Sequence, residues 1–464
     1  MCVTVSTKWP PLANFAASYS RFGVDYTPVL RSASMKAAKL AWLVLAVYLA
    51  PAIAQQQKIY ALKAARVFDS LAGVVIEPGL VIVADGKVQS VGGSAIPSGA
   101  TVIDLHDATL LPGFIDAHTH LTFDFDPDYE GAQLRGLQRT IAEQAIRSTE
   151  NARKTLMAGF TTVRDVGSSD FLDVGLRDSI NAGVVIGPRM LVAVHALGST
   201  GGHCDGGAGF RFGALDHETG PRDGVVNSAD DARYAVRFNI KYGADIIKTC
   251  ASGGVLSPTD DVDVPQLTQT ELNAIVEEAH MLRRKTAAHA HGAEAAKRAI
   301  HAGIDSIEHG TFLDDEALRL MHDRGVFLVP TLTTRIGLEQ SKFPPRVKAK
   351  ADTAVKQQDN LVRRAIALGV KIALGTDAAV YPHGRNAEEF MLMAADGMSA
   401  AQALQAGTVT ASELLGLGDR VGALKPGFLA DVVAVRGNPL TDLKTTQTVI
   451  FVMKEGVVYK NAAF

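Results

Sequence analysis

Cysteine is scarce in this chain, and its scarcity limits how the fold can be stabilised. Only Cys2, Cys204 and Cys250 occur among 464 residues. Three cysteines cannot build a disulfide framework of the kind that holds small secreted domains together. Hydrophobic residues make up 47% of the chain and charged residues 20%, which is typical of a well-packed globular protein. The fold is therefore expected to depend on a hydrophobic core.

The chain also lacks a strong charge of one sign. Its formal net charge is −3 at pH 7, and no long run of lysine or arginine appears. A nucleic-acid-binding surface needs a basic stripe or patch, so no nucleic-acid partner is expected. The length of 464 residues suits a large barrel with an accessory domain better than one small domain.

Residues 35–54 predict a secretory signal peptide. Lys36 and Lys39 form a basic start, an apolar run covers residues 40–50, and small residues at 52–54 fit a cleavage site. The apolar run is short for a membrane span, and no cysteine stands at the cleavage point to take a lipid. A membrane anchor or a packed helix is the alternative. We expect a periplasmic or secreted protein with no stable membrane span after signal removal.

Both ends of the mature chain contain short β-strand patterns separated by turn signals such as DG and GG. Such patterns predict antiparallel strands. We expect a small β-sandwich domain built from residues 55–112 and 419–464. Residues 1–34 show no clear periodicity and are expected to be an over-long or non-native extension.

The middle of the chain, residues 113–418, alternates between apolar strand patterns and helical stretches rich in Ala, Leu, Glu, Arg and Lys. The strand patterns are FIDAHTHL, TTVRDVG, RMLVAVHAL, ADIIKTC, TAAHAHG, SIEHG, VFLVPTL and KIALGTD. This alternation predicts an α/β fold of the (β/α)₈ TIM-barrel type. A doubly wound open sheet is the alternative. A glycine-rich insertion, residues 198–224, follows the third strand, and in a barrel such a loop lies over the active-site face.

Unusual polar residues stand at the ends of these strands: His118, His120, Lys248, His289, His291, His309 and Asp377. The carboxyl ends of all barrel strands converge on one mouth, so these residues should become neighbours. The spacing in DAHTHL also puts two histidines on one strand face. Histidines gathered in this way favour a metal site. For any one histidine the alternative is a hydrogen-bonded core residue, and Asp377 could cap the following helix.

Lys248 is chemically the most unusual of these residues. Lysine is almost never fully buried unless it is paired, because desolvating an ammonium group costs several kcal/mol. Among metal ligands it would also be repelled by the cations. A carbamate, formed from the amine and carbon dioxide, carries negative charge and two oxygens that can bridge two divalent ions. The alternative is a lysine that reaches the surface or pairs with a carboxylate. Cys250 shares this face and is interpreted as a small buried pocket residue.

Six segments together resemble the amidohydrolase superfamily: LLPGFIDAHTHL, IKTCASGG, AHAHG, SIEHG, ALGTDA and GALKPGFLADVVAV. Their order and spacing cover nearly the whole mature chain, residues 55–464. Among subgroups, the chain looks most like imidazolonepropionase-like, exported metal-dependent dipeptidases and carboxypeptidases with a carbamylated lysine. An ochratoxin-hydrolysing amidohydrolase is related to that group.

The resemblance implies a role for each strand-end residue. The ligands of the more buried ion would be His118, His120 and Asp377. Those of the more exposed ion would be His289 and His309, with carbamylated Lys248 bridging the pair. His291 is left as a neighbour or a substrate contact. True imidazolonepropionases are mononuclear and lack the strand-four lysine, which argues against that activity.

The expected chemistry is attack on an amide carbonyl by a hydroxide shared between two divalent ions, for which Zn²⁺ suits the ligands best. Asp377 would take the hydroxide's proton and return it to the leaving amine. His195 could bind the oxyanion or a substrate carboxylate, or be structural. Supporting contacts are expected from Asp116 and Glu308. Other candidates for a substrate carboxylate are His203, Arg211, Arg222, Arg335, His383 and Arg385.

The leading hypothesis is a binuclear metal-dependent amidohydrolase that cleaves a dipeptide or an N-acyl amino acid. By resemblance, Xaa-Pro dipeptides, dipeptides ending in Arg or Lys, and ochratoxin-type amides are candidate substrates, and a homo-oligomer is expected. A cyclic amide or lactone hydrolase on the same metal centre is the second hypothesis. A non-catalytic binding barrel is the third, but an intact ligand set argues against it.

Overall fold

The computed structural model describes residues 58–215 and 217–462. The predicted signal peptide, residues 35–54, and the preceding segment lie outside these described residues. No helix in the described part of the chain is long and apolar enough to cross a membrane.

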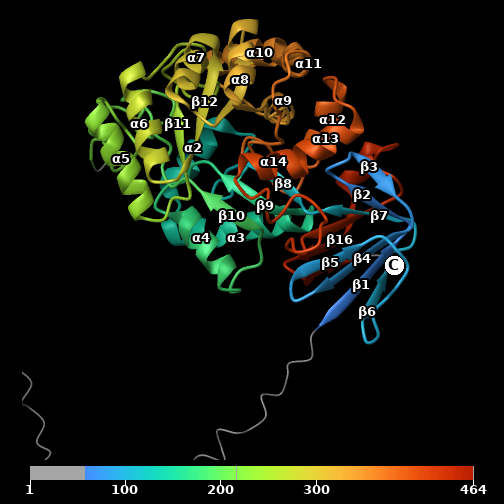
Figure 1. The fold of residues 1–464 in the computed structure, drawn as a ribbon. Helices are drawn as coiled ribbons and strands as arrows, with labels where there is room; N and C mark the ends of the chain where they lie inside the picture. Colours follow the sequence, from blue (N-terminus) through green and yellow to red (C-terminus); the bar gives the residue numbers. More distant parts are fainter. Residues whose placement is uncertain (1–57, 216, 463–464) are drawn as a thin grey trace, which may run out of the picture. The chain divides into compact units, whose positions relative to one another are not determined.

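The barrel consists of two groups of parallel strands that close on each other (Figure 1). The first group contains β8 (Phe114–Thr119), β9 (Phe160–Asp165) and β10 (Arg189–Val192). The second contains β11 (Ile246–Cys250), β12 (Lys285–Gly292), β13 (Ser306–Phe312) and β14 (Phe327–Val329).

Isolated parallel bridges complete the ring of strands. Leu197 pairs with Thr249 and so joins the first group to β11. The segment 371–378 takes the eighth position, because Ile372 pairs with Leu328 and Ala378 pairs with Thr119. The predicted (β/α)₈ barrel is therefore confirmed, and the open doubly wound sheet is wrong.

Helices connect the barrel strands and cover their outer side (Figure 1). Those before β14 are α2 (Tyr129–Gln138), α3 (Ile141–Met157), α4 (Leu172–Asn181), α5 (Ala229–Lys241), α6 (Gln269–Met281), α7 (Ala293–Ala302) and α8 (Asp315–Arg324). Those after it are α9 (Thr334–Gln340), α10 (Pro345–Gln357), η1 (Gln358–Asn360), α11 (Leu361–Ala367), α12 (Glu388–Ala395), α13 (Ala400–Gln405), η2 (Ala406–Thr410) and α14 (Ala411–Leu414). The ends of α7 and α8 are set by Gly303 and Gly325, whose left-handed backbone turns the chain toward the next strand.

Two sheets form the β-sandwich, and one of them combines both ends of the chain. The first has the order β5-β4-β1-β6, from β1 (Ile59–Ala64), β4 (Gly79–Ala84), β5 (Lys87–Val91) and β6 (Thr101–Asp104). The second has the order β17-β16-β15-β7-β2-β3. Its strands are β2 (Arg66–Asp69), β3 (Val74–Ile76), β7 (Ala108–Pro112), β15 (Val432–Arg436), β16 (Val449–Lys454) and β17 (Val457–Asn461), with η3 (Leu443–Gln447) between β15 and β16.

The pairing of β7 with β15 joins the two ends, with Leu110 opposite Ala434. Leu62 and Val81 of one sheet pack with Leu110 and Phe451 of the other in one buried cluster. The predicted contribution of both chain ends to this domain is confirmed.

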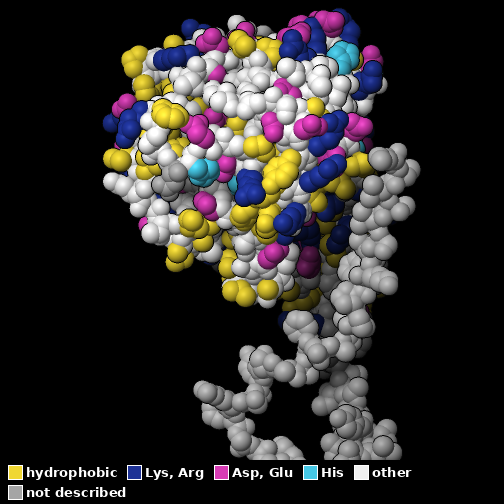
Figure 2. Space-filling view, turned by 90° about the vertical axis from the view of Figure 1, so that its left-hand side faces the viewer, with side chains coloured by type: hydrophobic (Ala, Val, Ile, Leu, Met, Phe, Trp, Pro, Cys, Tyr) yellow, Lys and Arg dark blue, Asp and Glu magenta, His cyan; other side chains and the backbone are white. Residues whose placement is uncertain are grey.

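The sandwich leads directly into the strand that carries DAHTHL. Only Gly113 separates β7 from β8, and a Cβ at this position would overlap with the side chain of Thr161 on β9. The first barrel strand therefore starts from a backbone that is anchored by β15. On the face drawn in Figure 2, basic, acidic and hydrophobic side chains are interspersed.

Candidate metal centre

Two groups of potential ligands lie at the carboxyl ends of the barrel strands. One contains His118, His120 and Asp377, and the other contains His289, His291 and His309. Within each group the ligand atoms lie within 4.8 Å of one another. Both groups and Lys248 line one cavity of about 400 Å³. The structure thus brings together all seven strand-end residues that the sequence singled out.

The first group is built on the alternation of side chains along β8. The Nε2 atoms of His118 and His120 lie 3.5 and 3.4 Å from Oδ1 of Asp377. The Nδ1 atom of His120 donates a hydrogen bond of 2.9 Å to the carbonyl of Gly167. That bond leaves Nε2 as the nitrogen with a free lone pair, pointing toward Asp377.

A buried charge chain orients His118. Its Nδ1 atom lies 2.7 Å from Glu308, whose other oxygen accepts a 2.8 Å hydrogen bond from Arg164. Burial raises the pKa of Glu308, but Arg164 and His118 outweigh it and bring the pKa down to about 2. Glu308 therefore stays ionised. Arg164 was not predicted as part of the site, although a fully buried arginine next to an aspartate in TTVRDVG is as unusual as a buried lysine.

Asp116 fixes the backbone that carries the ligands. It accepts hydrogen bonds from the N–H groups of His118 and Thr376, from the hydroxyl of Thr376, and from Asn386. This carboxylate therefore joins the first barrel strand to the eighth. Asp377 follows directly, with its backbone in the left-handed region at φ 57°, a conformation that costs energy and is held by its surroundings.

The second group is held in the same manner. Nε2 of His289 donates to the carbonyl of Gly253 at 3.1 Å. Thr331 donates its hydroxyl proton to Pro330, so it accepts the 2.8 Å hydrogen bond from Nδ1 of His309. His291 lies beside them, bonded to Thr311 at 2.8 Å, with its ring 4.9 Å from that of His309. By geometry it belongs with the second group, whereas the family resemblance leaves it outside the ligand set.

Burial keeps the imidazoles of His120, His289, His291 and His309 neutral. It lowers the pKa of His120 to about 4 and that of His291 to about 3, and it lowers the pKa of His289 and His309 well below the ordinary value. The neutral imidazole is the form that binds metals. The donor set of neutral imidazoles and one carboxylate thus fits divalent ions.

Lys248 is buried between these groups, with only 3% of its surface exposed. No carboxylate in the described part of the chain lies within ion-pairing distance of its Nζ atom. Burial lowers the pKa of its amine to about 8, although Glu308 and Asp377 act in the opposite direction. The amine therefore neither reaches the surface nor forms an ion pair.

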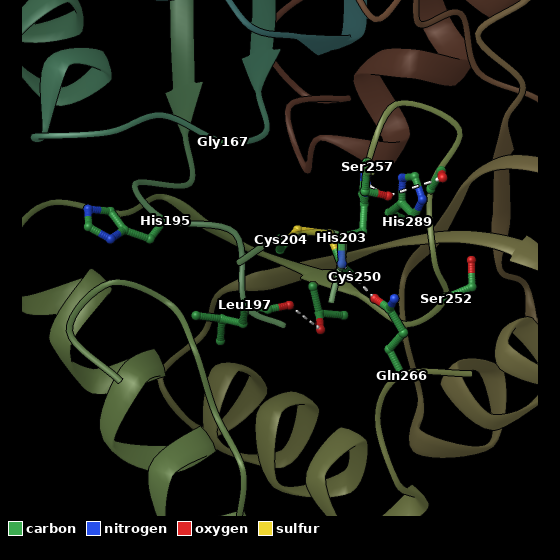
Figure 3. Close-up of a disulfide and its surroundings, with 12 residues drawn as sticks. Gly167, His195, Leu197, His203, Cys204, Cys250, Ser252, Ser257, Gln266 and His289 are labelled. Carbon is green, nitrogen blue, oxygen red and sulfur yellow. Dashed lines mark hydrogen bonds between the residues drawn. A yellow bond between two sulfur atoms is a disulfide. The ribbon is translucent and has the colours of Figure 1, made fainter. Parts of the chain in front are cut away.

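Two further candidate residues, His203 and His195, lie in different places relative to the cavity. His203 lines the cavity, and its ring stacks on that of His289 at 4.2 Å. His195 points away from His203 and His289 (Figure 3) and packs against Phe171, with 5.5 Å between ring centres. The structure does not bring His195 to the ligand groups.

The predicted carboxylate-binding residues other than His203 do not line the cavity. Arg335 forms an ion pair with Asp396, His383 donates to the carbonyl of Phe123, and Arg385 lies over the ring of Tyr381. Arg211 and Arg222 are on the glycine-rich loop, where Arg222 contacts Tyr234.

Cys250 takes part in a contact that the sequence did not predict. It is buried and lines the cavity as expected, but it forms a disulfide with Cys204, with Cα atoms 5.9 Å apart. The two cysteines are 46 residues apart in sequence, and they meet only because the loop after β10 folds back over the end of β11. Cysteine count alone gave no sign of this pairing.

Known proteins resemble this chain in sequence and in fold. The model of the amidohydrolase family matches residues 109–459. The ochratoxinase of Aspergillus niger is 33% identical over 378 residues, which covers 76% of this chain and 75% of that protein. The crystal structure of a Xaa-Pro dipeptidase with bound methionine in the active site is similar with a TM-score of 0.82 and 38% identity, over 87% of this chain and 100% of that one. A prolidase complexed with N-methylphosphonate-L-proline gives 0.78 and 30% identity over 87% and 100%.

The charge chain behind His118 predicts a defect in metal binding. Glu308→Gln removes the negative charge that orients His118 and neutralises Arg164, so metal affinity should fall by about 10–100-fold. Metal retained after dialysis against a weak competing chelator measures this loss. Glu277→Gln, on an exposed side chain of α6, is the matched control. Unchanged metal retention in a folded Glu308→Gln protein would contradict the role assigned to the charge chain.

Proposed function

The chain belongs to the amidohydrolase family, and from this premise we propose that it is a binuclear metal-dependent hydrolase of amides whose leaving group is an amino acid. Dipeptides, Xaa-Pro dipeptides among them, and N-acyl amino acids are the proposed substrate class. The observation that carries the proposal is that both ligand groups line one cavity together with the buried amine of Lys248.

The ligand chemistry supports two divalent ions, with Zn²⁺ as the proposed metal, because imidazole and carboxylate ligands suit zinc. His118, His120 and Asp377 would hold one ion, and His289 and His309 the other. Lys248 supports the pair as a carbamate: its neutral amine adds to carbon dioxide and loses a proton, which yields an anion with two oxygens. A buried amine without a carboxylate partner is suited to this reaction.

The ions, when bound, would make a nucleophile available from water near neutral pH and polarise the amide carbonyl. Asp377 is the proposed proton acceptor. Burial raises its pKa, but His118, His120 and Lys248 outweigh burial, so the pKa lies below its ordinary value and the carboxylate is ionised. Asp377 then returns the proton to the leaving amine, which must be protonated to depart.

The cavity wall supports an apolar group in the substrate. Aromatic and aliphatic side chains form much of it: Phe123, Phe125, Tyr129, Val255, Leu256, Leu338, Phe343 and Val380. Burying such a group contributes about 25 cal/mol per Å² of apolar surface removed from water. The structure of the Xaa-Pro dipeptidase holds methionine, and the relative from Aspergillus niger is an ochratoxinase. Dipeptides and acyl amino acids with an apolar residue are therefore favoured.

We also propose that the protein is exported to the periplasm or secreted. The signal-peptide pattern of residues 35–54 supports this, and so does the disulfide between Cys204 and Cys250, since disulfides persist in oxidising compartments. A homo-oligomer stays a prediction from the family resemblance.

A substrate screen tests the proposed reaction. The purified protein with Zn²⁺ is offered a library of dipeptides and N-acyl amino acids beside a library of lactones and cyclic amides, and release of free amino acid or acid is followed. We expect turnover of amides that carry an apolar residue next to the scissile bond. Turnover of lactones alone would replace the amidase proposal with its cyclic-substrate alternative.

Replacement of Lys248 tests the binuclear arrangement. Wild-type protein should contain close to two divalent ions per chain, and Lys248→Ala should contain fewer and lose activity, because no bridging anion can form. Added short carboxylic acids should partly restore metal binding. Lys348→Ala, at an exposed lysine on α10, is the control for removal of a lysine. Full turnover by Lys248→Ala would rule out the carbamate.

A further inference from the structure

We propose that the Cys204–Cys250 disulfide is a positioning element for substrate binding. It fixes the glycine-rich loop, residues 198–224, and with it the ring of His203 above the cavity. The inference rests on the proposed function, because its main effect is expected on the Michaelis constant of amide hydrolysis.

The two sulfurs join parts of the site with different tasks. Cys250 is the last residue of β11, two residues after Lys248, and its N–H donates to the carbonyl of Leu197. Cys204 follows His203 on the loop (Figure 3), and both cysteines line the cavity. The bond therefore ties the loop to the strand that carries Lys248.

The loop has little regular structure of its own. Its described residues between 199 and 224 contain no helix and no strand. Its backbone hydrogen bonds are mostly short-range, such as those from Gly202 to Ser199 and from Asp205 to Gly202. A segment of this kind opens at low free-energy cost. A covalent bond to a buried strand removes the open conformations of the loop near Cys204.

The ring of His203 occupies a narrow position. A Cβ at Gly254 would overlap with it, so the ring lies directly on that glycine. Its Nδ1 atom is 3.0 Å from the hydroxyl of Ser257, and its backbone N–H donates to Gln266 at 2.9 Å. The stacking on His289 adds a further contact. Small shifts of the loop would break these contacts together.

His203 also lines a neighbouring cavity of about 380 Å³. The second cavity lies between α2 and the loop, and its walls include Leu137, Asp205 and Phe210. His203, Tyr129 and Leu256 line both cavities. The position of the loop therefore sets the shape of this wall. The part of a substrate that extends beyond the scissile bond would lie against it.

None of the proposed metal ligands is on this loop. Loss of the disulfide should therefore weaken substrate binding and leave the metal centre and the chemical step in place. This separates a positioning role from a general structural role, which would lower metal content and turnover together.

The double variant Cys204→Ala/Cys250→Ala tests the proposal without leaving an unpaired thiol at either end of the disulfide. We expect its KM for the best amide substrate to rise at least about tenfold, with kcat within about threefold of wild type and two metal ions retained. Phe212→Ala is the matched control, because this side chain is 87% exposed on the same loop and lines neither cavity. Its KM should equal that of the wild type.

Chemical reduction of the disulfide is an independent test of the proposal. A phosphine reductant takes the oxygen atom of one water molecule and becomes the phosphine oxide, while the disulfide takes up two electrons and the two protons of that water to become two thiols. Reduced wild type should show the same rise in KM, whereas the double variant should not respond. Mass spectrometry of unreduced peptides must also show the Cys204–Cys250 link.

Several results would overturn the inference. These are absence of the linked peptide, an unchanged KM in the double variant, or a parallel loss of metal and kcat. If no amide is turned over by wild type, the proposed function fails, and limited proteolysis still tests the loop. Cleavage within residues 199–224 should then be faster in the double variant, and equal rates would count against a positioning role.

Discussion

Each histidine of the two ligand groups gives one ring nitrogen to an oxygen of the surrounding fold, and the site depends on these five hydrogen bonds. The oxygens belong to Glu308, Gly167, Gly253, Thr311 and Thr331. A buried imidazole cannot rotate without losing such a bond, at a cost of about 1–3 kcal/mol. The other nitrogen of each ring therefore keeps its direction, and little ordering is left for ion binding to achieve.

Burial also affects the protonation of His120 and Lys248 in the barrel mouth. It lowers the pKa of His120 to about 4 and that of Lys248 to about 8, because a cation loses its hydration in the barrel mouth. Neutral imidazoles can bind an ion, and a less basic amine has more of the unprotonated form that adds to carbon dioxide. Glu308 stays ionised because Arg164 and His118 outweigh the same burial. Neutral imidazoles and an ionised carboxylate therefore lie side by side in the same buried region.

The sequence predicted the barrel and the clustering of its strand-end residues, because apolar periodicity and the convergence of strand ends are local rules applied repeatedly. The prediction failed where a single backbone torsion or a long-range contact determines where a side chain lies. Val194 has a positive φ of 66°, so the alternation of β10 does not extend to His195, and that ring turns toward Phe171 instead of the cavity. The pairing of Cys204 with Cys250, and the ion pair of Arg335 with Asp396, likewise follow from how distant segments meet.

The cavity walls limit how a substrate can be recognised. Among its described lining residues, Lys248 is the only lysine or arginine, and the proposed carbamate removes that positive charge. A carboxylate on the proposed substrate would therefore meet neutral hydrogen-bond donors or the proposed ions, and the aromatic wall would favour the proposed apolar neighbour. Burial lowers the pKa of His203 on this wall to about 4, so its ring is neutral. The proposed role of the Cys204–Cys250 disulfide is to hold the ring of His203 in place on this wall, because Cys204 follows His203 directly and both line the cavity.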